Sequence, residues 1–262
     1  MWEEPRVGRL AAWGNALLAG LAAPDDAAAG VVGDDRTHRV VGLPGESGPV
    51  GLTLALGRLR ALGAVGLRIA LPAPGHPLGL SGPPEFNEAA LVAGEAALVA
   101  GPALGLVPEV ETRGPVGDEL TEVVWRVMAV RPAPPADVPS LGEAERELAE
   151  AMRDATTALS VLDVAGSGPV ADAALAAYRA RMERGRQLLA PGYPPRALRV
   201  LELAGRVAAL VEIAGRDGAG AAVSAGEMAR RDALLRPVER AARRARVAAY
   251  NAYAEELERQ RG

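Results

Sequence analysis

A proline-rich stretch in the middle of the chain separates two halves with different hydrophobic patterns. Residues 131–139 read Arg-Pro-Ala-Pro-Pro-Ala-Asp-Val-Pro, and proline-rich segments act as stiff, extended connectors. Short β-branched runs bounded by glycine and proline precede it, whereas long runs of good helix formers follow it. The sequence therefore predicts an α/β domain over residues 1–131, a connector over 132–140 and an all-α domain over 141–262.

The start of the first half predicts a sheet built around a βαβ unit. Residues 6–21 carry apolar side chains at helical spacing, and the small, acidic stretch 23–35 is typical of a loop. The β-branched runs 37–43 and 65–71 are typical of strands, and the leucine-bearing segment 49–63 between them has the length of a helix. A strand, a helix and a second strand favour a parallel, right-handed crossover.

The rest of the first half predicts a helix and three further strands. A helix over 83–93 should end near Gly94, because glycine inside a helix costs about 1 kcal/mol. Strands over 95–100, 104–111 and 121–130 follow, separated by glycine and proline. Such closely spaced strands form an antiparallel meander, so the expected sheet is mixed.

The second half predicts four helices. They cover residues 141–164, 169–189, 195–214 and 224–259, with glycine or proline at the breaks. Antiparallel helices joined by short loops pack most simply as a four-helix bundle. The last helix is long enough to extend past its partners or to bend.

Two residue types are missing, and their absence excludes several kinds of chemistry. The chain has no cysteine and no lysine, and it has only two histidines. This removes thiol nucleophiles, Cys-ligated metals, the phosphate-loop lysine and Schiff-base chemistry. We therefore expect no cofactor and no metal site. The net charge of −4, the lack of a signal peptide at the start and the lack of a membrane-spanning apolar run predict a cytoplasmic protein without a membrane partner.

Two copies of Gly-x-Ser-Gly-Pro, at 45–49 and 79–83, follow the first two predicted strands. Neither is a nucleophile elbow, because proline replaces the final glycine. A third Ser-Gly-Pro at 167–169 opens a predicted helix, so all three are explained as helix starts. If both strand-following helices begin at the same sheet edge, their N–H groups could also hold a small anion. The predicted ligand-binding residues are Gly45, Ser47, Gly48, His76, Ser81 and Asn87.

A hydrolase hypothesis uses the same loops. His76 could face Ser47, with Asp34, Asp35 or Glu85 orienting the imidazole. His38, near the start of its strand, is instead expected to be exposed or hydrogen-bonded. Asn87 lies between Glu85 and Glu88, whose position in a first helical turn favours helix capping.

Arginines cluster in the last predicted helix, with seven between residues 230 and 246. At helical spacing Arg236, Arg240, Arg243 and Arg244 share one face, and alanine and valine occupy the opposite one. The pattern is typical of a solvated bundle helix, and it also suits an acidic protein partner. Nucleic-acid binding is an alternative that the acidic total charge and the few aromatic residues disfavour.

Three stretches resemble those of uncharacterised proteins from high-GC actinobacteria. They read Leu-Pro-Ala-Pro-Gly-His-Pro-Leu-Gly-Leu at 71–80, Pro-Glu-Phe-Asn-Glu-Ala-Ala-Leu at 84–91 and Pro-Gly-Tyr-Pro-Pro-Arg at 191–196. The resemblance covers most of the chain and implies no activity and no site residue. The sequence thus favours a non-catalytic interaction or regulatory protein that binds a protein partner or itself through the helical region. The alternatives are anion binding or hydrolysis at the strand–helix loops, and nucleic-acid binding through the last helix.

Overall fold

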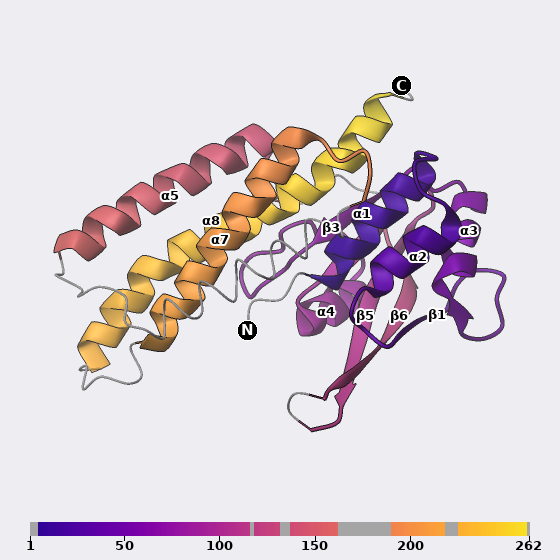
Figure 1. Cartoon of the computed structure of the whole chain (residues 1–262), viewed down its shortest axis with the longest axis horizontal. Helices are drawn as coiled ribbons and strands as arrows, with labels where there is room; N and C mark the ends of the chain where they lie inside the picture. Colours follow the sequence, from indigo (N-terminus) through magenta and orange to yellow (C-terminus); the bar gives the residue numbers. More distant parts are fainter. Residues whose placement is uncertain (1–4, 116–117, 132–136, 162–189, 218–224, 261–262) are drawn as a thin grey trace. The chain divides into compact units, whose positions relative to one another are not determined.

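The computed structural model describes residues 5–115, 118–131, 137–161, 190–217 and 225–260 (Figure 1). The chain divides into two compact units. The sheet unit comprises Glu4–Val138, Leu188–Pro194 and Tyr250–Gly262. The helical unit comprises Met1–Glu3, Pro139–Gln187 and Pro195–Ala249. The last turns of the final helix therefore belong to the sheet unit, although the rest of that helix belongs to the helical unit.

A six-stranded mixed sheet forms the centre of the sheet unit, with the strand order β2-β1-β6-β5-β4-β3. β4, β5 and β6 pair antiparallel in sequence order, which confirms the predicted meander. β1 pairs parallel with β6. The strands are β1 (Thr37–Val41), β2 (Val50–Gly51), β3 (Gly66–Ala70), β4 (Ala96–Ala100), β5 (Leu104–Arg113) and β6 (Leu120–Ala129).

The predicted parallel βαβ unit is wrong. Three strands separate β1 from β3, and the chain of pairings makes these two strands antiparallel to each other. β6 takes the place beside β1, where its Trp125 side chain donates a hydrogen bond from Nε1 to Nδ1 of His38 at 3.2 Å. This partner lies 87 residues along the chain from His38, so a pattern of neighbouring residues could not predict it.

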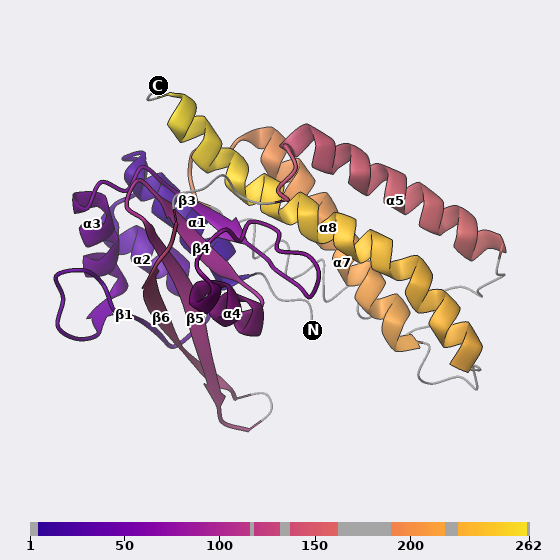
Figure 2. The ribbon, with the colours of Figure 1, turned by 180° about the vertical axis from the view of Figure 1, so that it is seen from behind.

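Helices cover both faces of the sheet (Figures 1 and 2). Phe86, in α4 (Pro84–Ala93), packs against one face together with Ala70 and Val107. Three further helices cover the other face: α1 (Arg6–Leu18), α2 (Pro24–Val32) and α3 (Leu52–Ala61). α4 ends at Gly94, as predicted, and Gly94 adopts the left-handed conformation.

The loop predicted for residues 23–35 is wrong, because α2 occupies most of it. Pro24 stands at the first helical turn, and the acids Asp25 and Asp26 complement the helix dipole there. Gly30 packs against the Trp13 ring so closely that a Cβ would overlap it. The helix is therefore stabilised by contact with α1, which short-range composition does not reveal.

Two asparagine side chains seal the outer edge of β3. Asn15 of α1 donates from Nδ2 to the Leu67 carbonyl at 2.9 Å and accepts from the Leu67 N–H at 2.7 Å. Asn251 of α8 (Ala225–Arg259) makes the same pair of bonds with Ile69, at 3.2 and 2.7 Å. Both asparagines are buried. Their amides thus replace a seventh strand at an edge whose backbone groups would otherwise be unpaired.

The last turns of α8 are packed into the sheet unit by aromatic contacts. Tyr250 is buried against α1, where a Cβ on Gly8 would lie 2.5 Å from the tyrosine ring. The Tyr193 hydroxyl donates to the Tyr250 carbonyl at 2.9 Å, and the Tyr253 hydroxyl donates to the Pro191 carbonyl at 3.0 Å. These contacts hold residues 190–194 and the end of α8 together in one unit.

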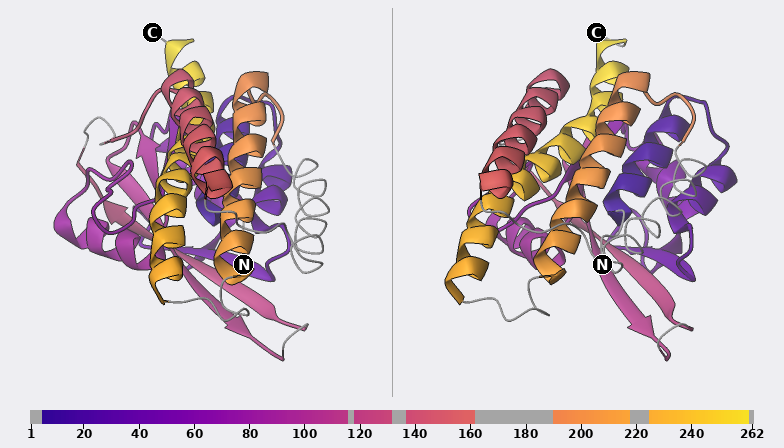
Figure 3. Two further views of the ribbon diagram at one scale, coloured as in Figure 1. Left: turned by 90° about the vertical axis from the view of Figure 1, so that its left-hand side faces the viewer. Right: turned by 60° about the vertical axis from the view of Figure 1, so that its left-hand side comes forward.

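Three described helices make up the helical unit, namely α5 (Leu141–Val161), α7 (Pro195–Asp217) and the larger part of α8 (Figure 3). Ala144 and Leu148 of α5 are fully buried, as is Ala204 of α7. The helix predicted over 169–189 lies outside the described residues. Helices in the second half are therefore confirmed for the described residues, and the four-helix bundle remains a prediction.

Candidate functional sites

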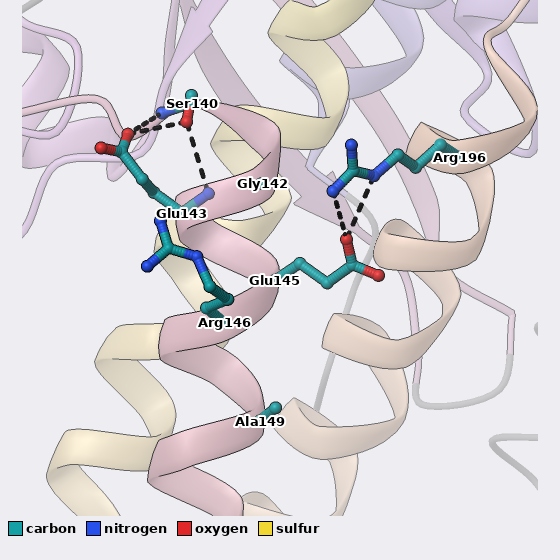
Figure 4. Close-up of a pocket in the computed structure, with 7 residues that line it drawn as sticks. All are labelled: Ser140, Gly142, Glu143, Glu145, Arg146, Ala149 and Arg196. Atoms are coloured by element: carbon teal, nitrogen blue, oxygen red, sulfur yellow. Dashed lines mark hydrogen bonds and ion pairs between the residues drawn. The ribbon is translucent and has the colours of Figure 1, made fainter.

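An open hollow of about 460 Å³ lies at the start of α5. Figure 4 shows the residues around it. Ser140 and Glu143 form a capping box, in which the Ser140 hydroxyl donates to Glu143 Oε2 at 2.7 Å and accepts from the Glu143 N–H at 3.3 Å. The Ser140 N–H donates to the same carboxylate at 2.9 Å. This reciprocal arrangement is a helix-starting device.

The charges around this hollow neutralise one another. Arg196 of α7 donates two hydrogen bonds to Glu145 Oε2, at 3.1 and 2.8 Å. Hydrogen bonds from the side chain and backbone of Ser140 hold the pKa of Glu143 below its ordinary value, and the nearby Arg146 charge acts in the same direction. Glu145 thus occupies Arg196, whereas the exposed Arg146 acts on Glu143 through its charge alone. The ion pair between Arg196 and Glu145 links α5 to α7.

A buried polar network in the sheet unit centres on Asp35, at the turn before β1. Asp35 accepts hydrogen bonds from Arg6 at 2.9 and 3.1 Å and from Arg9 at 2.5 Å. His38 Nε2 lies 3.0 Å from Asp35 Oδ2, and His38 Nδ1 accepts from Trp125. Burial alone would raise the Asp35 pKa, but the His38 and Arg6 hydrogen bonds and the two arginine charges hold it far below its ordinary value.

The network fixes the protonation of His38. Because Nδ1 accepts the Trp125 proton, Nε2 must carry the hydrogen that Asp35 accepts. Neither ring nitrogen is then free to remove a proton from a substrate, and the imidazole is buried. The network therefore ties α1 to β1 and β6. His38 is hydrogen-bonded, which was one of the two environments expected for it.

The structure does not bring Ser47 and His76 together. Ser47 follows β1, near one end of the strand order, and His76 follows β3 at the opposite edge of the sheet. Since β1 and β3 run antiparallel, the two loops also leave opposite ends of the sheet. The converging N–H groups on which the anion site depended are therefore absent from these two loops. Asp35, one proposed orienting acid, is already bound by Arg6 and Arg9.

The turn at Gly45 is filled by a side chain of the protein itself. Arg58 of α3 donates from Nε to the Pro44 carbonyl at 3.3 Å and lies 3.9 Å from a Glu46 carboxylate oxygen. A Cβ on Gly45 would overlap the Arg58 guanidinium. The arginine thus takes the position over this turn that an anion was expected to take, while Ser47 and Gly48 are exposed.

Of the two serine motifs among the described residues, only the one at 79–83 precedes a helix directly, and proline rather than serine starts α4, which has no side-chain cap. Pro83 is the N-cap of α4, so Ser81 comes just before the helix and Asn87 follows in its first turns. α3 begins at Leu52, after β2, so the motif at 45–49 does not start it. The motif at 167–169 lies outside the described residues. Ser81 Oγ and Asn87 Oδ1 are buried and have no hydrogen-bond partner within the part of the chain that the structure describes.

The four arginines predicted to share a face of α8 differ in environment. Arg236 and Arg240 are exposed and form no ion pair with any described residue. Arg244 donates to Glu147 of α5 at 2.8 Å, so it holds two helices together. Arg243 is half-buried, and burial lowers its pKa although the Glu239 charge raises it. The exposed cationic part of the face therefore narrows to Arg236 and Arg240.

Several interactions could not be seen in the sequence analysis, although two of the residue pairs left a local signal. Ser140 and Glu143 fit the Ser-x-x-Glu capping pattern before a helix. Asp35 and His38 are three residues apart, which is close enough for a local pair. Asn15 and Asn251 left no local signal, because their partners are 52 and 182 residues away.

Two general properties complete the description of the sites. Within residues 5–115, 118–131, 137–161, 190–217 and 225–260, no group of three or more His, Asp or Glu side chains could hold a metal ion. None of the helices described combines the length and the apolar character needed to cross a membrane.

The architecture defines a chain of two parts, a mixed α+β unit and a helical unit, and two family models match these parts in turn. One, described as the N-terminal domain of Rv1486c-like protein, matches residues 7–138. The other, described as the C-terminal domain of the same protein, matches residues 142–247. The chain belongs to the Rv1486c-like family.

Mycobacterial relatives agree with this assignment. The uncharacterized protein Rv1486c of Mycobacterium tuberculosis is 36% identical over 236 residues, which cover 78% of this chain and 81% of the relative. The uncharacterized protein ML1804 of Mycobacterium leprae is 32% identical over an aligned length of 289 positions, and the alignment covers 93% of this chain and 95% of the relative. No solved structure matches the chain. The expected resemblance to proteins of high-GC actinobacteria is confirmed.

Proposed function

We propose that the chain is a non-catalytic interaction protein whose helical unit binds an acidic segment of a protein partner. The proposal is carried by Arg236 and Arg240, two exposed cations four residues apart on α8 that have no ion pair among the described residues. Arginine suits such a role because its planar fork can bind a carboxylate through two hydrogen bonds. Arg244 is bound to Glu147 and Arg243 is half-buried, so Arg236 and Arg240 are the members of this face most open to a partner.

The remaining sites support a binding role over catalysis. The serine and histidine of the hydrolase hypothesis lie at opposite edges of the sheet, and both nitrogens of His38 are engaged. The two acids that line the hollow beside α5 are already bound by Ser140 and Arg196. Among the described groups, the exposed arginines are therefore the better candidates for an external ligand.

An acidic peptide that stands in for the partner segment tests the proposal. The probe is a fluorescent poly-glutamate peptide of about twenty residues, long enough to pass both arginines on one helix face. Anisotropy titration should show salt-sensitive binding. Replacing both residues (Arg236→Glu, Arg240→Glu) should weaken binding at least about tenfold, because attraction becomes repulsion at two positions.

The matched control changes the same charge elsewhere. Arg39 and Arg60 of the sheet unit are also exposed, and replacing both with glutamate should leave binding within about twofold of the original value. An equal loss in both double variants would show that only total charge matters and would contradict the proposal. Tighter binding of single-stranded DNA of the same length would instead favour the nucleic-acid alternative.

A further inference from the structure

One long stretch of strand edge in the sheet has no partner strand among the described residues. β5 pairs with β6 along all ten of its residues, but β4 pairs only with residues 104–106 of β5. The other side of β5 is therefore open from Val107 onward. Residues 109–113 are all exposed, and this end of the β5–β6 hairpin projects beyond the other strands (Figures 1 and 2).

The hydrogen bonds of the hairpin show which backbone groups face the open side. The Val130 N–H donates to the Ala103 carbonyl, so the odd-numbered residues of β5 direct their backbone N–H and C=O groups toward β6. The Thr121 carbonyl accepts from the Arg36 N–H, so the backbone groups of Thr121 point away from β5. Thr121 and its partner Thr112 are therefore a pair without backbone hydrogen bonds between them. The even-numbered positions of β5, Val110 and Thr112 among them, therefore direct their N–H and C=O groups outward.

Two features of the chain limit the open stretch to five residues. On one side, Pro108 has no N–H, and β4 begins at Ala96, close to the end of its pairing with β5. On the other side, Gly114 leaves the strand with a φ of 114°. The segment 109–113 between these limits can add one more antiparallel strand of the same length.

The charges along this segment are self-complementary. One face of β5 carries three charged side chains at every second residue, namely Glu109, Glu111 and Arg113. If a second copy runs antiparallel with Val110 opposite Thr112, then Glu109 of each copy lies opposite Arg113 of the other. Each such pair is attractive, and the register allows four backbone hydrogen bonds through Val110 and Thr112.

The same register places the two Glu111 side chains opposite each other at the symmetry axis. Each is already bound by Arg113 of its own chain, with Nη2 to Oε1 at 2.6 Å. Glu109 is likewise paired with Arg126, and Glu122 lies 3.7 Å from Arg36. Glu109, Glu111 and Glu122 thus each have an arginine of the same chain, which reduces the repulsion between the two Glu111 side chains.

We propose that the β5 edge pairs antiparallel with the β5 edge of a second copy of the chain, giving a weak homodimer with a continuous sheet. The interaction is a strand addition in which main-chain hydrogen bonds supply affinity and the alternate side chains fix the register. It does not involve Arg236 or Arg240, so it stands or falls independently of the proposed partner binding.

Hydrogen exchange of single amides gives the sharpest test. The full-length protein is compared at about 0.01 mM and about 1 mM, a range suited to a weak dimer. The Val110 and Thr112 amides should become protected at the higher concentration, whereas the Glu109 and Glu111 amides, which bond to β6, should be protected equally at both. Unchanged protection of all four amides would overturn the proposal.

Sedimentation equilibrium of variants tests the interface itself. Val110→Pro removes an outward N–H without touching the β6 ladder, and it should leave a folded monomer over the same concentrations. Arg113→Glu should weaken the dimer about tenfold, because attraction is replaced by repulsion at two symmetry-related positions. Adding Glu109→Arg to Arg113→Glu should restore association. A monomeric original chain, or dimers indifferent to all of these changes, would exclude the β5 edge.

Discussion

The outer edge of β3 and the open stretch of β5 differ in what lies against their backbone N–H and C=O groups. At β3 the side-chain amides of Asn15 and Asn251 bond the N–H and C=O groups of Leu67 and Ile69, and helices bury the contact. At β5 the segment 109–113 is exposed and carries alternating charges. A sheet edge in this family member can thus be closed by the chain itself or left available to another chain.

The difference lies in where the closing groups come from in the sequence. α1 and the end of α8 supply the amides for β3, so this edge depends on residues 182 positions apart. Beyond its short contact with β4, β5 has β6 as its strand partner, which follows it directly in the sequence. We therefore expect the β3 edge to control folding and the β5 edge to control association.

The largest effect should follow from removing residues 250–262. This truncation deletes Asn251 together with the buried Tyr250 and Tyr253 contacts, and we expect a loss of more than about 5 kcal/mol in the free energy of unfolding of the sheet unit. Urea unfolding followed by Trp13 and Trp125 fluorescence measures it. Ending the chain after Arg259 instead should leave the midpoint unchanged. Equal midpoints for both truncations would show that α8 does not seal this unit.

A single asparagine should produce the next largest effect. Asn251→Ala leaves the buried N–H and C=O of Ile69 unpaired, at a cost of about 4 kcal/mol, and Asn15→Ala should cost a similar amount at Leu67. Asn87→Ala is the control, because the buried Asn87 Oδ1 accepts no hydrogen bond from a described residue. If all three variants unfold at similar denaturant concentrations, the sealing role is refuted.

Asp35 should contribute less, and its contribution should depend on pH. Asp35→Asn should lower the free energy of unfolding by about 2 to 3 kcal/mol at pH 7, because it removes the charge that Arg6 and Arg9 share. The folded-state pKa of Asp35 lies below its ordinary value. Its stabilisation is therefore complete above the unfolded pKa of about 4 and declines as the pH falls toward the folded value.

Unfolding curves between pH 3 and pH 7 can check this, with the range chosen to cross the ordinary pKa of aspartate, near 4. The difference between the original chain and Asp35→Asn should shrink toward the acidic end. A difference that is constant, or that grows on acidification, would assign the stability to other groups.

The smallest effect on stability should come from the open edge. Val110→Pro should change the free energy of unfolding by less than about 1 kcal/mol, because its N–H has no partner in the monomer. Glu111→Pro, one residue away, should cost at least about 2 kcal/mol, because it removes a hydrogen bond to β6. Chemical unfolding at low protein concentration compares them. Equal losses would mean that the assignment of outward and inward positions is wrong.

Local patterns explain why part of the fold could be predicted. The meander from β4 to β6 joins strands that follow one another, so the glycine and proline boundaries and the alternation around Trp125 suffice. α4 likewise carries its own end signal at Gly94. The pairing of β1 with β6 joins residues more than 80 positions apart, and its stabilising His38–Trp125 hydrogen bond is visible only after folding.

The shared sheet edge assumed for the candidate ligand site was wrong for the same reason. It required β1 and β3 to be parallel neighbours, and two strands with a helix between them satisfy that pattern without proving it. The Arg58 side chain that fills the Gly45 turn belongs to the predicted helix, but its direction depends on where α3 begins. The shared face of Arg236 and Arg240 could be predicted, because helical spacing alone places them on one side of α8.

The placement of Asn251 has a consequence for synthesis of the chain. On the ribosome, the strands of the sheet unit emerge first, yet the amide that closes Ile69 is made 182 residues after it. At about 5 to 20 residues per second, translating the helical region takes several seconds or more, during which β3 is exposed and able to pair with other nascent chains. Synthesis of the end of α8, rather than completion of the sheet, is the event that closes this edge.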